Sequence, residues 1–296
     1  MKFLATMWFR SFLCVGLMLG AIDAQAGSYS VFSDDGSINV GRDSLFTVLT
    51  AGNFSDLNNQ VADSGVITGN EGIGGKANYS MSSGSLNGDL YMNSFGTLSI
   101  SGSGKITGKK RGAKTVQGED GQDQTAGLAN ALADAQSLAS AAAALTKTSN
   151  YAVTHGSFTQ GQSISISSSA NDITINGTTN NPFNQPIVLS INAFSLTSGS
   201  LTLNGNSHTT FVLNITGNFT MNDNSSILAT GGLLASHILF NLEASSPTTS
   251  FTVGMGATAT GVFIAPNRNL DLGGNIYGRL VTNQLTITCG GKVVSE

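Results

Sequence analysis

One short pattern occurs twice in succession between Gly256 and Thr288. Each copy has a pair of glycines, then an apolar run, and it ends in a triplet whose outer residues are apolar. The second glycines of the two copies, Gly261 and Gly278, are 17 positions apart. A fixed period with glycine corners and two-residue alternation is typical of stacked β-solenoid coils. The pattern therefore predicts a mainly β fold, a parallel β-solenoid (β-helix).

The same glycine corner recurs in the first part of the chain. Its form is glycine, any residue, an apolar residue, any residue, glycine, and it begins at Gly65, Gly84 and Gly104, as it does again at Gly274. The first three corners are 19 and 20 positions apart. This spacing predicts coils of about 17 to 20 residues with three short strands each, in a triangular or flattened section.

The stretch from Glu119 to Lys147 interrupts this pattern. It is rich in alanine and leucine, and its only β-branched residues are threonines near its ends, which favours a helix. Apolar residues recur at three- and four-residue steps and form one stripe. The stripe consists of Leu128, Ala131, Leu132, Ala135, Leu138, Ala139, Ala142 and Leu145. We predict one long helix, capped by Asp123 or Thr125, inserted between two solenoid portions with its stripe packed on a solenoid face.

A second motif is a triplet with apolar outer residues and a hydroxyl in the middle. It occurs at 46–48, 98–100, 164–166, 173–175, 189–191, 201–203, 219–221, 251–253 and 285–287. Because strand side chains alternate, the apolar residues are predicted to point into the solenoid and the hydroxyls outward. The outer surface should then carry rows of short, uncharged side chains.

The first 26 residues resemble a cleaved signal peptide. Lys2 and Arg10 flank an apolar segment that is too short to span a membrane, and small residues precede a cleavage position after Ala26. We therefore predict a signal peptide at 1–26 and a single β-solenoid domain at 27–296, with no later membrane span. The protein should be exported, to the cell surface or the extracellular space, with the periplasm as a further option. Cys289 would then be the single cysteine of the mature chain, tolerated only if it is buried or pairs between molecules.

Composition limits the partners. Only 10% of the residues are charged, against roughly 25% in ordinary soluble domains. The predicted mature chain carries a net charge of about −5, which argues against nucleic acid as a partner. Surface glycans, other proteins and ice remain as candidate partners.

The chain resembles the choice-of-anchor A domain of bacterial exported proteins, and it is similar to the ice-binding protein superfamily. The resemblance rests on the segments Ile187–Asn192, Thr210–Phe219, His237–Leu242, Gly261–Leu270 and Gly274–Gly278. It covers most of residues 45–291. It implies a right-handed β-solenoid flanked by a long helix, on an exported protein without known catalysis. Many such proteins carry a C-terminal anchor, and we expect none in this chain, which counts against attachment to the cell surface.

Catalytic and metal-binding motifs are sparse. The acids of the second half stand apart in the sequence, whereas polysaccharide-active β-helix enzymes need paired carboxylates. His155, His208 and His237 lack neighbouring acids or cysteines at ligand spacing. We therefore predict no enzyme activity, no cofactor and no metal site. We interpret Arg268 and Arg279 as solvated side chains, and the basic run at 109–111 as a solvated loop or a protease-sensitive linker.

Two functions of different kinds remain. The first is a non-enzymatic structural or adhesive module, and the alternative is an ice-binding protein that acts through a flat face rich in serine and threonine. A polysaccharide-active enzyme is a third and weaker hypothesis. The candidate binding face consists of Thr202, Thr220, Thr252, Thr258, Thr260, Thr286 and Thr288. Asp271 stands at a position where this pattern expects a hydroxyl, and its charge counts against ice.

Overall fold

A computed structural model describes residues 45–51, 58–61, 64–76, 78–177, 186–243, 249 and 251–295. The predicted signal peptide lies outside these residues. The described chain is mainly β with one long helix, as the sequence predicts. Its strands pair in parallel from coil to coil, except that β11 (Tyr151–His155) runs antiparallel to β13 (Ile173–Gly177), so the sheet is mixed.

The strands form three series, which we call faces A, B and C. Face A contains β13, β16 (Gly199–Asn204), β19 (Ser225–Thr230), the first parts of β22 (Thr258–Leu272) and β23 (Asn275–Ile287), β24 (Lys292–Val294), β3 (Val66–Thr68), β6 (Ser85–Asn87) and β9 (Lys105–Ile106). Face B contains β14 (Ile187–Ile191), β17 (Phe211–Ile215), β20 (Ile238–Leu242), the middle parts of β22 and β23, β1 (Val48–Thr50), β4 (Glu71–Ile73), β7 (Leu90–Met92) and β10 (Lys110–Arg111).

Face C contains β12 (Ile164–Ile166), β15 (Phe194–Leu196), β18 (Phe219–Met221), β21 (Phe251–Val253), the last parts of β22 and β23, β2 (Asn58–Val61), β5 (Asn78–Met81) and β8 (Leu98–Ile100). The chain visits the faces in the order A, B, C in every coil. Short turns of 3-10 helix that lie wholly within the described residues are η2 (Lys114–Val116), η3 (Ser169–Asn171) and η4 (Ala235–His237).

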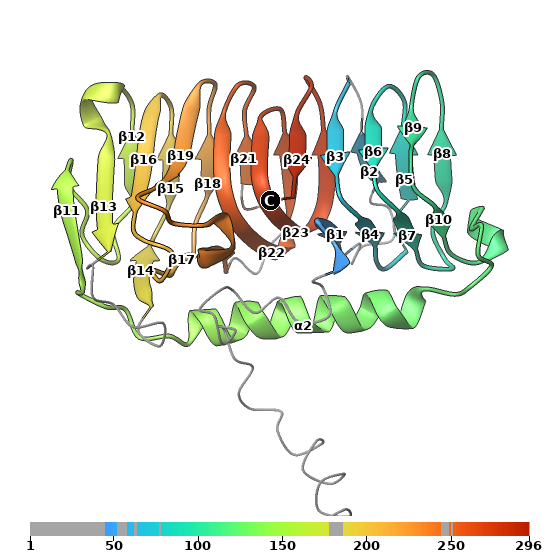
Figure 1. The fold of residues 1–296 in the computed structure, drawn as a ribbon, viewed down its shortest axis with the longest axis horizontal. Helices are drawn as coiled ribbons and strands as arrows, with labels where there is room; N and C mark the ends of the chain where they lie inside the picture. Colours follow the sequence, from blue (N-terminus) through green and yellow to red (C-terminus); the bar gives the residue numbers. More distant parts are fainter. Residues whose placement is uncertain are drawn as a thin grey trace, which may run out of the picture. The chain divides into compact units, whose positions relative to one another are not determined.

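The order of coils in space differs from their order in the sequence. Strand β1 pairs with β23, and β3 pairs with β24, so the first coil of the chain stacks on the last. Residues 48–111 therefore extend the stack beyond the C-terminal strands. The chain then has to return to the opposite end of the stack, where β11 and β12 lie, and α2 (Thr125–Ala143) makes this passage (Figure 1). Its 19 residues span about 28 Å at about 1.5 Å per residue.

The helix packs along face B, below the strands in Figure 1. Six of the predicted stripe residues are buried, namely Leu128, Ala131, Leu132, Ala135, Leu138 and Ala142. Gly72 and Gly74 on face B leave room for Leu128 and Leu132, because a side chain at either glycine would collide with these leucines. Glycine in these two positions thus lets the helix lie directly on the strands.

The helix is shorter than the predicted 119–147. At its start, Asp120 accepts hydrogen bonds from the backbone N–H groups of Gly112 and Gln122, which hold the preceding residues in a turn. The N-cap residue is Gln124, which makes no side-chain cap hydrogen bond, so the predicted cap at Asp123 or Thr125 is wrong. Asp123 instead accepts from the N–H of Thr125 at 2.9 Å. At the other end, the N–H of Thr148 donates to Val188 O on the edge strand β14, so the chain is already extended there. Hydrogen bonds made outside the helix therefore accompany both of its ends.

The middle residues of the predicted glycine corners form face A strands, and the second glycines lie between faces A and B and stack on one another. A Cβ at Gly88 would lie against the carbonyl oxygen of Gly69, and one at Gly278 would lie against that of Gly261. Gly69, Gly261 and Gly278 also have φ values of 116°, 145° and 134°, which strongly favour glycine. Close approach of successive coils is the physical reason for the period seen in the sequence.

The interior follows the triplet prediction. In the seven triplets from 164–166 onward, the outer residues are buried and the middle hydroxyl is half-buried or exposed, which confirms the predicted alternation. Two earlier triplets differ: Thr47 is buried, and Ile100 is 41% exposed because β8 ends the stack on face C. Phenylalanines fill the C-terminal coils, where Phe194 stacks on Phe219 and Phe240 on Phe263, both pairs with ring centroids 4.6 Å apart.

Candidate binding face

The middle residues of the face C strands form a continuous row. Ser165, Ser195, Thr220 and Thr252 are directly paired from coil to coil in β12, β15, β18 and β21. Parallel neighbours in a sheet are about 4.8 Å apart, so the hydroxyls repeat at that step. We call these four residues the hydroxyl row. It places one short, uncharged polar group on each of four successive coils.

Beyond the hydroxyl row, face C changes in character. Thr252 pairs with Asp271, which is exposed, and Asp271 pairs with Thr286. The next position is Gln60, followed by Ser80 and Ser99 on β5 and β8. Hydroxyls therefore resume after Asp271, but the carboxylate separates them from the hydroxyl row. Asp271 occupies a hydroxyl position, as the sequence pattern predicts, and the pairing of the strands places it near the middle of the face.

The predicted binding residues fall on two faces rather than one. Thr220, Thr252 and Thr286 share the central line of face C, and Thr288 follows the end of β23. Thr202, Thr258 and Thr260 belong to face A. The same triplet occurs on different faces because each coil has three strands, and inward and outward side chains alternate in all of them. The sequence shows which side chains point outward, but it does not show from which face.

Face A is less uniform than the hydroxyl row. Thr202 pairs with Thr174, and Thr258 pairs with Ser226. Further along, Thr260 pairs with Tyr277, which is 36% exposed, and Asn275 pairs with Lys292. Bulky and charged side chains thus project from this face, whereas the hydroxyl row contains neither.

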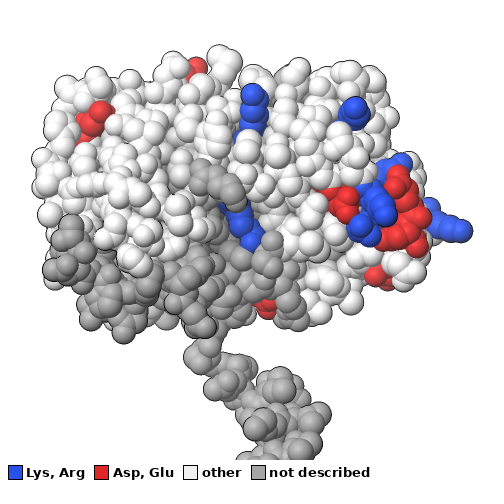
Figure 2. All heavy atoms as spheres, viewed as in Figure 1, with Lys and Arg blue, Asp and Glu red and all other residues white. Residues whose placement is uncertain are grey.

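Charged side chains gather at one end of the solenoid. In the view of Figure 2 they cluster where β10 lies in Figure 1, and most of the remaining surface is uncharged. Arg111 pairs with Asp89 at 2.7 Å and lies 3.9 Å from Asp120, and Lys110 lies 3.5 Å from Glu119. The N–H of Lys109 and the Arg111 guanidinium lower the pKa of Asp89. The basic run is therefore part of a paired strand end, and its interpretation as a solvated loop is wrong.

The burial of one arginine and of one glutamate was not predicted. Arg268 is fully buried, so its interpretation as solvated is wrong; Arg279 is half-buried. The Arg268 guanidinium donates to the carbonyl oxygens of Gly217 at 2.7 Å and Ile215 at 3.0 Å. The glutamate is Glu71, which points into the solenoid interior in register with Val48 and Leu90. Neither burial is visible in the sequence. The alternation of apolar and polar residues around each position does not decide whether its side chain points into the solenoid or out to solvent.

Burial controls the protonation of Glu71. The buried Tyr79 hydroxyl is the polar group that faces the Glu71 carboxyl group, and neither has a further hydrogen-bond partner among the described residues. Burial raises the pKa of Glu71 to about 8, and the Tyr79 hydroxyl opposes this shift only in part. The carboxyl group is thus predominantly protonated at neutral pH.

Metal-ligating side chains are not gathered in the described part of the chain. There, no group of three histidine, cysteine, aspartate or glutamate side chains lies close enough to hold a metal ion. Asp172 accepts a hydrogen bond from the N–H of Ser200 at 2.6 Å and thereby supports a strand end. Cys289 is exposed with a free thiol, so the first of its two predicted alternatives, burial, is wrong, and pairing between molecules stays a prediction. No helix among the described residues is long and apolar enough to cross a membrane.

Comparison with solved structures shows the fold. An ice-binding protein from the Antarctic ascomycete Antarctomyces psychrotrophicus has 17% identity and a TM-score of 0.53 over 87% of this chain and 98% of the other. One from an Arctic yeast has 19% identity and a TM-score of 0.54, covering 89% and 96%. An ice-binding protein domain of Shewanella frigidimarina has 16% identity and a TM-score of 0.51, covering 87% and 96%. At such low identity the likeness concerns the fold alone.

Comparison by sequence shows the family. A search of curated proteins finds no match. A family profile described as an ice-binding-like adhesive domain matches residues 19–294, which is nearly the whole chain. The resemblance to the ice-binding superfamily is thereby confirmed, while the narrower one to the choice-of-anchor A domain stays a prediction. This chain belongs to the ice-binding-like adhesive domain family.

Proposed function

We propose that this protein is an exported, non-enzymatic adhesive module that holds a neutral polysaccharide against face C. The observation that carries the proposal is the hydroxyl row, in which four short hydroxyls are in register on successive coils. The family assignment supports an adhesive role, and an adhesin would act at the cell surface or in the extracellular space.

The chemistry of the row suits an uncharged, hydroxyl-rich polymer. Serine and threonine hydroxyls both donate and accept hydrogen bonds, as sugar hydroxyls do. Their short side chains, held on paired strands, lose little conformational entropy on binding. Each contact is weak, but a polymer that touches several coils at once gains avidity from the repeat. The low charge of the row gives no preference for anionic or cationic ligands.

Ice is the second candidate, and the same row favours it. Its hydroxyls repeat at one fixed step without a charged side chain, and such a surface can order water in a regular array. Two features oppose this function. The row offers one central hydroxyl per coil, and Asp271 follows directly after Thr252. We therefore rank adhesion to a polymer first.

One set of variants separates these functions. The protein comprising residues 27–296 is tested for retention on insoluble neutral polysaccharides, for thermal hysteresis and for inhibition of ice recrystallisation. Thr220→Lys and Thr252→Lys place long charged side chains in the row and should weaken retention by at least about tenfold, or about 1.4 kcal/mol. Thr202→Lys, the same change on face A, is the matched control and should bind normally.

The outcomes are distinct. Retention that both row variants lose, without ice activity, supports adhesion. Ice activity that Thr220→Lys abolishes would replace adhesion by ice binding. If the wild-type protein is retained by no polysaccharide and inactive on ice, both functions of the row are wrong. Release of reducing ends from the polysaccharides would instead indicate an enzyme.

A further inference from the structure

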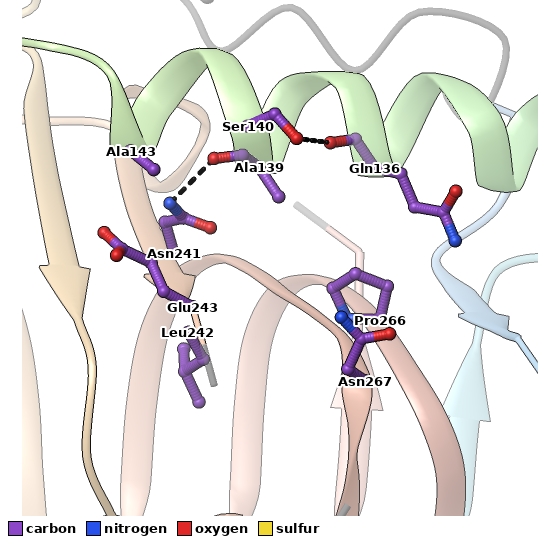
Figure 3. A pocket seen from close by; sticks show the side chains of 9 residues that line it. All are labelled: Gln136, Ala139, Ser140, Ala143, Asn241, Leu242, Glu243, Pro266 and Asn267. Atoms are coloured by element: carbon purple, nitrogen blue, oxygen red, sulfur yellow. Dashed lines mark hydrogen bonds between the residues drawn. The ribbon is translucent and has the colours of Figure 1, made fainter. Parts of the chain in front are cut away.

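A pocket of about 430 Å³ lies between α2 and the corners that follow β20 and the middle part of β22. Figure 3 shows its walls, with Gln136, Ala139 and Ser140 on the helix and Asn241, Glu243, Pro266 and Asn267 on the strands opposite. The pocket is separate from the hydroxyl row, which lies on face C. Its walls combine amide, hydroxyl and carboxylate groups with the apolar surfaces of Ala139 and Pro266.

A ladder of two asparagines leads to this pocket. Asn214 donates to Ala142 O at 2.8 Å, and Asn241 donates to Ala139 O at 3.0 Å and to Asn214 Oδ1 at 2.9 Å. Both asparagines thereby tie the helix to face B. The next position in register is Ile264, which has no polar group to continue the ladder.

The ladder therefore ends in an unsatisfied acceptor. Asn241 is fully buried, and its Oδ1 has no hydrogen-bond partner among the described residues. In Figure 3 this oxygen points away from the helix carbonyl, toward the space between α2 and Pro266. A buried carbonyl oxygen without a donor destabilises the folded state, because it loses the hydrogen bonds that water would give it. A donor supplied from the pocket would remove this destabilisation.

The charges around the pocket nearly cancel. The Glu243 carboxylate lines it, and the buried Arg268 guanidinium lies close enough to interact electrostatically with Glu243. Partial desolvation raises the pKa of Glu243, while Arg268 opposes this shift. A ligand with a full charge would disturb this balance, whereas a neutral ligand with several O–H groups would not. The acceptors that the pocket presents to such a ligand are Asn241 Oδ1 and the Glu243 carboxylate.

We infer that this pocket binds a single neutral sugar residue, such as the end or a side branch of a neutral glycan. Sugar hydroxyls donate to Asn241 and Glu243 and exchange hydrogen bonds with the amides of Gln136 and Asn267. The C–H face of the sugar packs against Ala139 and Pro266. The inference does not rest on the hydroxyl row, because a different part of the molecule forms the site.

The test uses the protein comprising residues 27–296 and small sugars. The probes are methyl α-D-glucopyranoside, methyl β-D-galactopyranoside, methyl α-D-mannopyranoside and N-acetyl-D-glucosamine, with glucuronate and glucosamine as charged comparisons. Saturation-transfer NMR detects binding, and the shift of the Asn241 side-chain amide resonance locates it. At least one neutral sugar should bind with a millimolar Kd and shift that resonance.

Two serines of the helix give a matched pair of variants. Ser140 lines the pocket and Ser137 does not, yet both are exposed and both donate to a carbonyl one turn earlier, at 2.9 and 2.8 Å. Ser140→Leu should fill the pocket and raise the Kd by at least about tenfold. Ser137→Leu should leave the Kd unchanged, and circular dichroism should show that both variants are folded.

Three results would overturn the inference. These are the absence of any neutral sugar that shifts the Asn241 resonance, equal binding by the two serine variants, and binding of the charged sugars alone. Thr220→Lys should retain sugar binding in the pocket. The experiment can thus disprove sugar binding in the pocket independently of polysaccharide binding by the hydroxyl row. The polysaccharide assay measures binding by the row separately.

Discussion

The two portions of the solenoid share one backbone pattern but differ in how they are filled. The C-terminal portion, residues 164–294, has strands of up to 15 residues and an interior of stacked phenylalanines. The N-terminal portion, residues 48–111, has strands of two to four residues. Its interior holds Tyr79 and the carboxyl group of Glu71 in place of a phenylalanine stack.

This difference indicates where the stability of the fold resides. Buried aromatic side chains and backbone hydrogen bonds between long paired strands hold the C-terminal coils together. The N-terminal coils depend more on their neighbours, since β1 and β3 pair with β23 and β24 and the helix packs Leu128 and Leu132 over Gly72 and Gly74. We therefore expect the C-terminal portion to act as the scaffold on which the N-terminal portion docks.

The largest expected effect is at the centre of the phenylalanine stack. Phe219 is stacked on Phe194 and makes edge contacts with Phe240, Phe251 and Phe263. Phe219→Ala should lower the free energy of unfolding by about 3 to 5 kcal/mol, because it removes buried surface and leaves a cavity. Urea denaturation measures this change.

The matched control is Phe95→Ala in the N-terminal portion. Phe95 is 65% exposed, so its loss should change stability by no more than about 0.5 kcal/mol. Similar effects of the two substitutions would contradict the assignment of the scaffold to the C-terminal portion.

The second prediction concerns pH and the N-terminal portion. The pKa of Glu71 rises from 4.5 to about 8 on folding, so the folded state holds a proton that the unfolded state releases between these values. Stability should therefore be fully present below pH 4.5 and fall as pH rises through 8. From pH 5.5 to 7.5 the loss is roughly 3 kcal/mol, at about 1.36 kcal/mol per pH unit.

Glu71→Gln retains the shape of the protonated side chain and cannot ionise. This variant should flatten the decline in unfolding free energy over the same pH range. Glu119→Gln, at an exposed surface position, should show the same decline in unfolding free energy as the wild-type protein. An unchanged pH profile in Glu71→Gln would show that the buried carboxyl group is not the cause.

The smallest effect is expected where the helix meets the scaffold. Asn214→Ala removes one hydrogen bond to Ala142 O and one acceptor for Asn241, at a cost of about 1 to 2 kcal/mol. Amide exchange should accelerate in the last two turns of α2 before it does so in β17. Equal acceleration in both elements would mean that the helix and the scaffold open as one unit.

Much of the local structure could be predicted from the sequence. The glycine period predicts the coils because only glycine fits where Gly88 and Gly278 meet the preceding coil. The apolar stripe predicts the buried side of α2, and the triplets predict which residues of the C-terminal strands point inward. These features depend on neighbours in the chain or on one repeat, so they are visible as a pattern.

The candidate site was only partly predictable. The sequence identifies Thr220, Thr252 and Thr286 as outward hydroxyls, but it groups them with Thr202, Thr258 and Thr260 from another face. It offers a weak signal for the pocket, an asparagine between apolar residues in both 211–215 and 238–242. The sequence does not show that these asparagines lie beside carbonyl groups of α2, and only the structure reveals this contact.

By itself, the sequence determined the repeat, the inward and outward alternation and the existence of the helix, since these follow from local sterics and periodicity. Only the tertiary structure decided that the first coil stacks on the last, and that Arg268 and Glu71 are buried. It also decided which hydroxyls form one row. The physical reason is that each coil presents equivalent strand edges, so long-range contacts select the stacking order, and with it the face to which each side chain belongs.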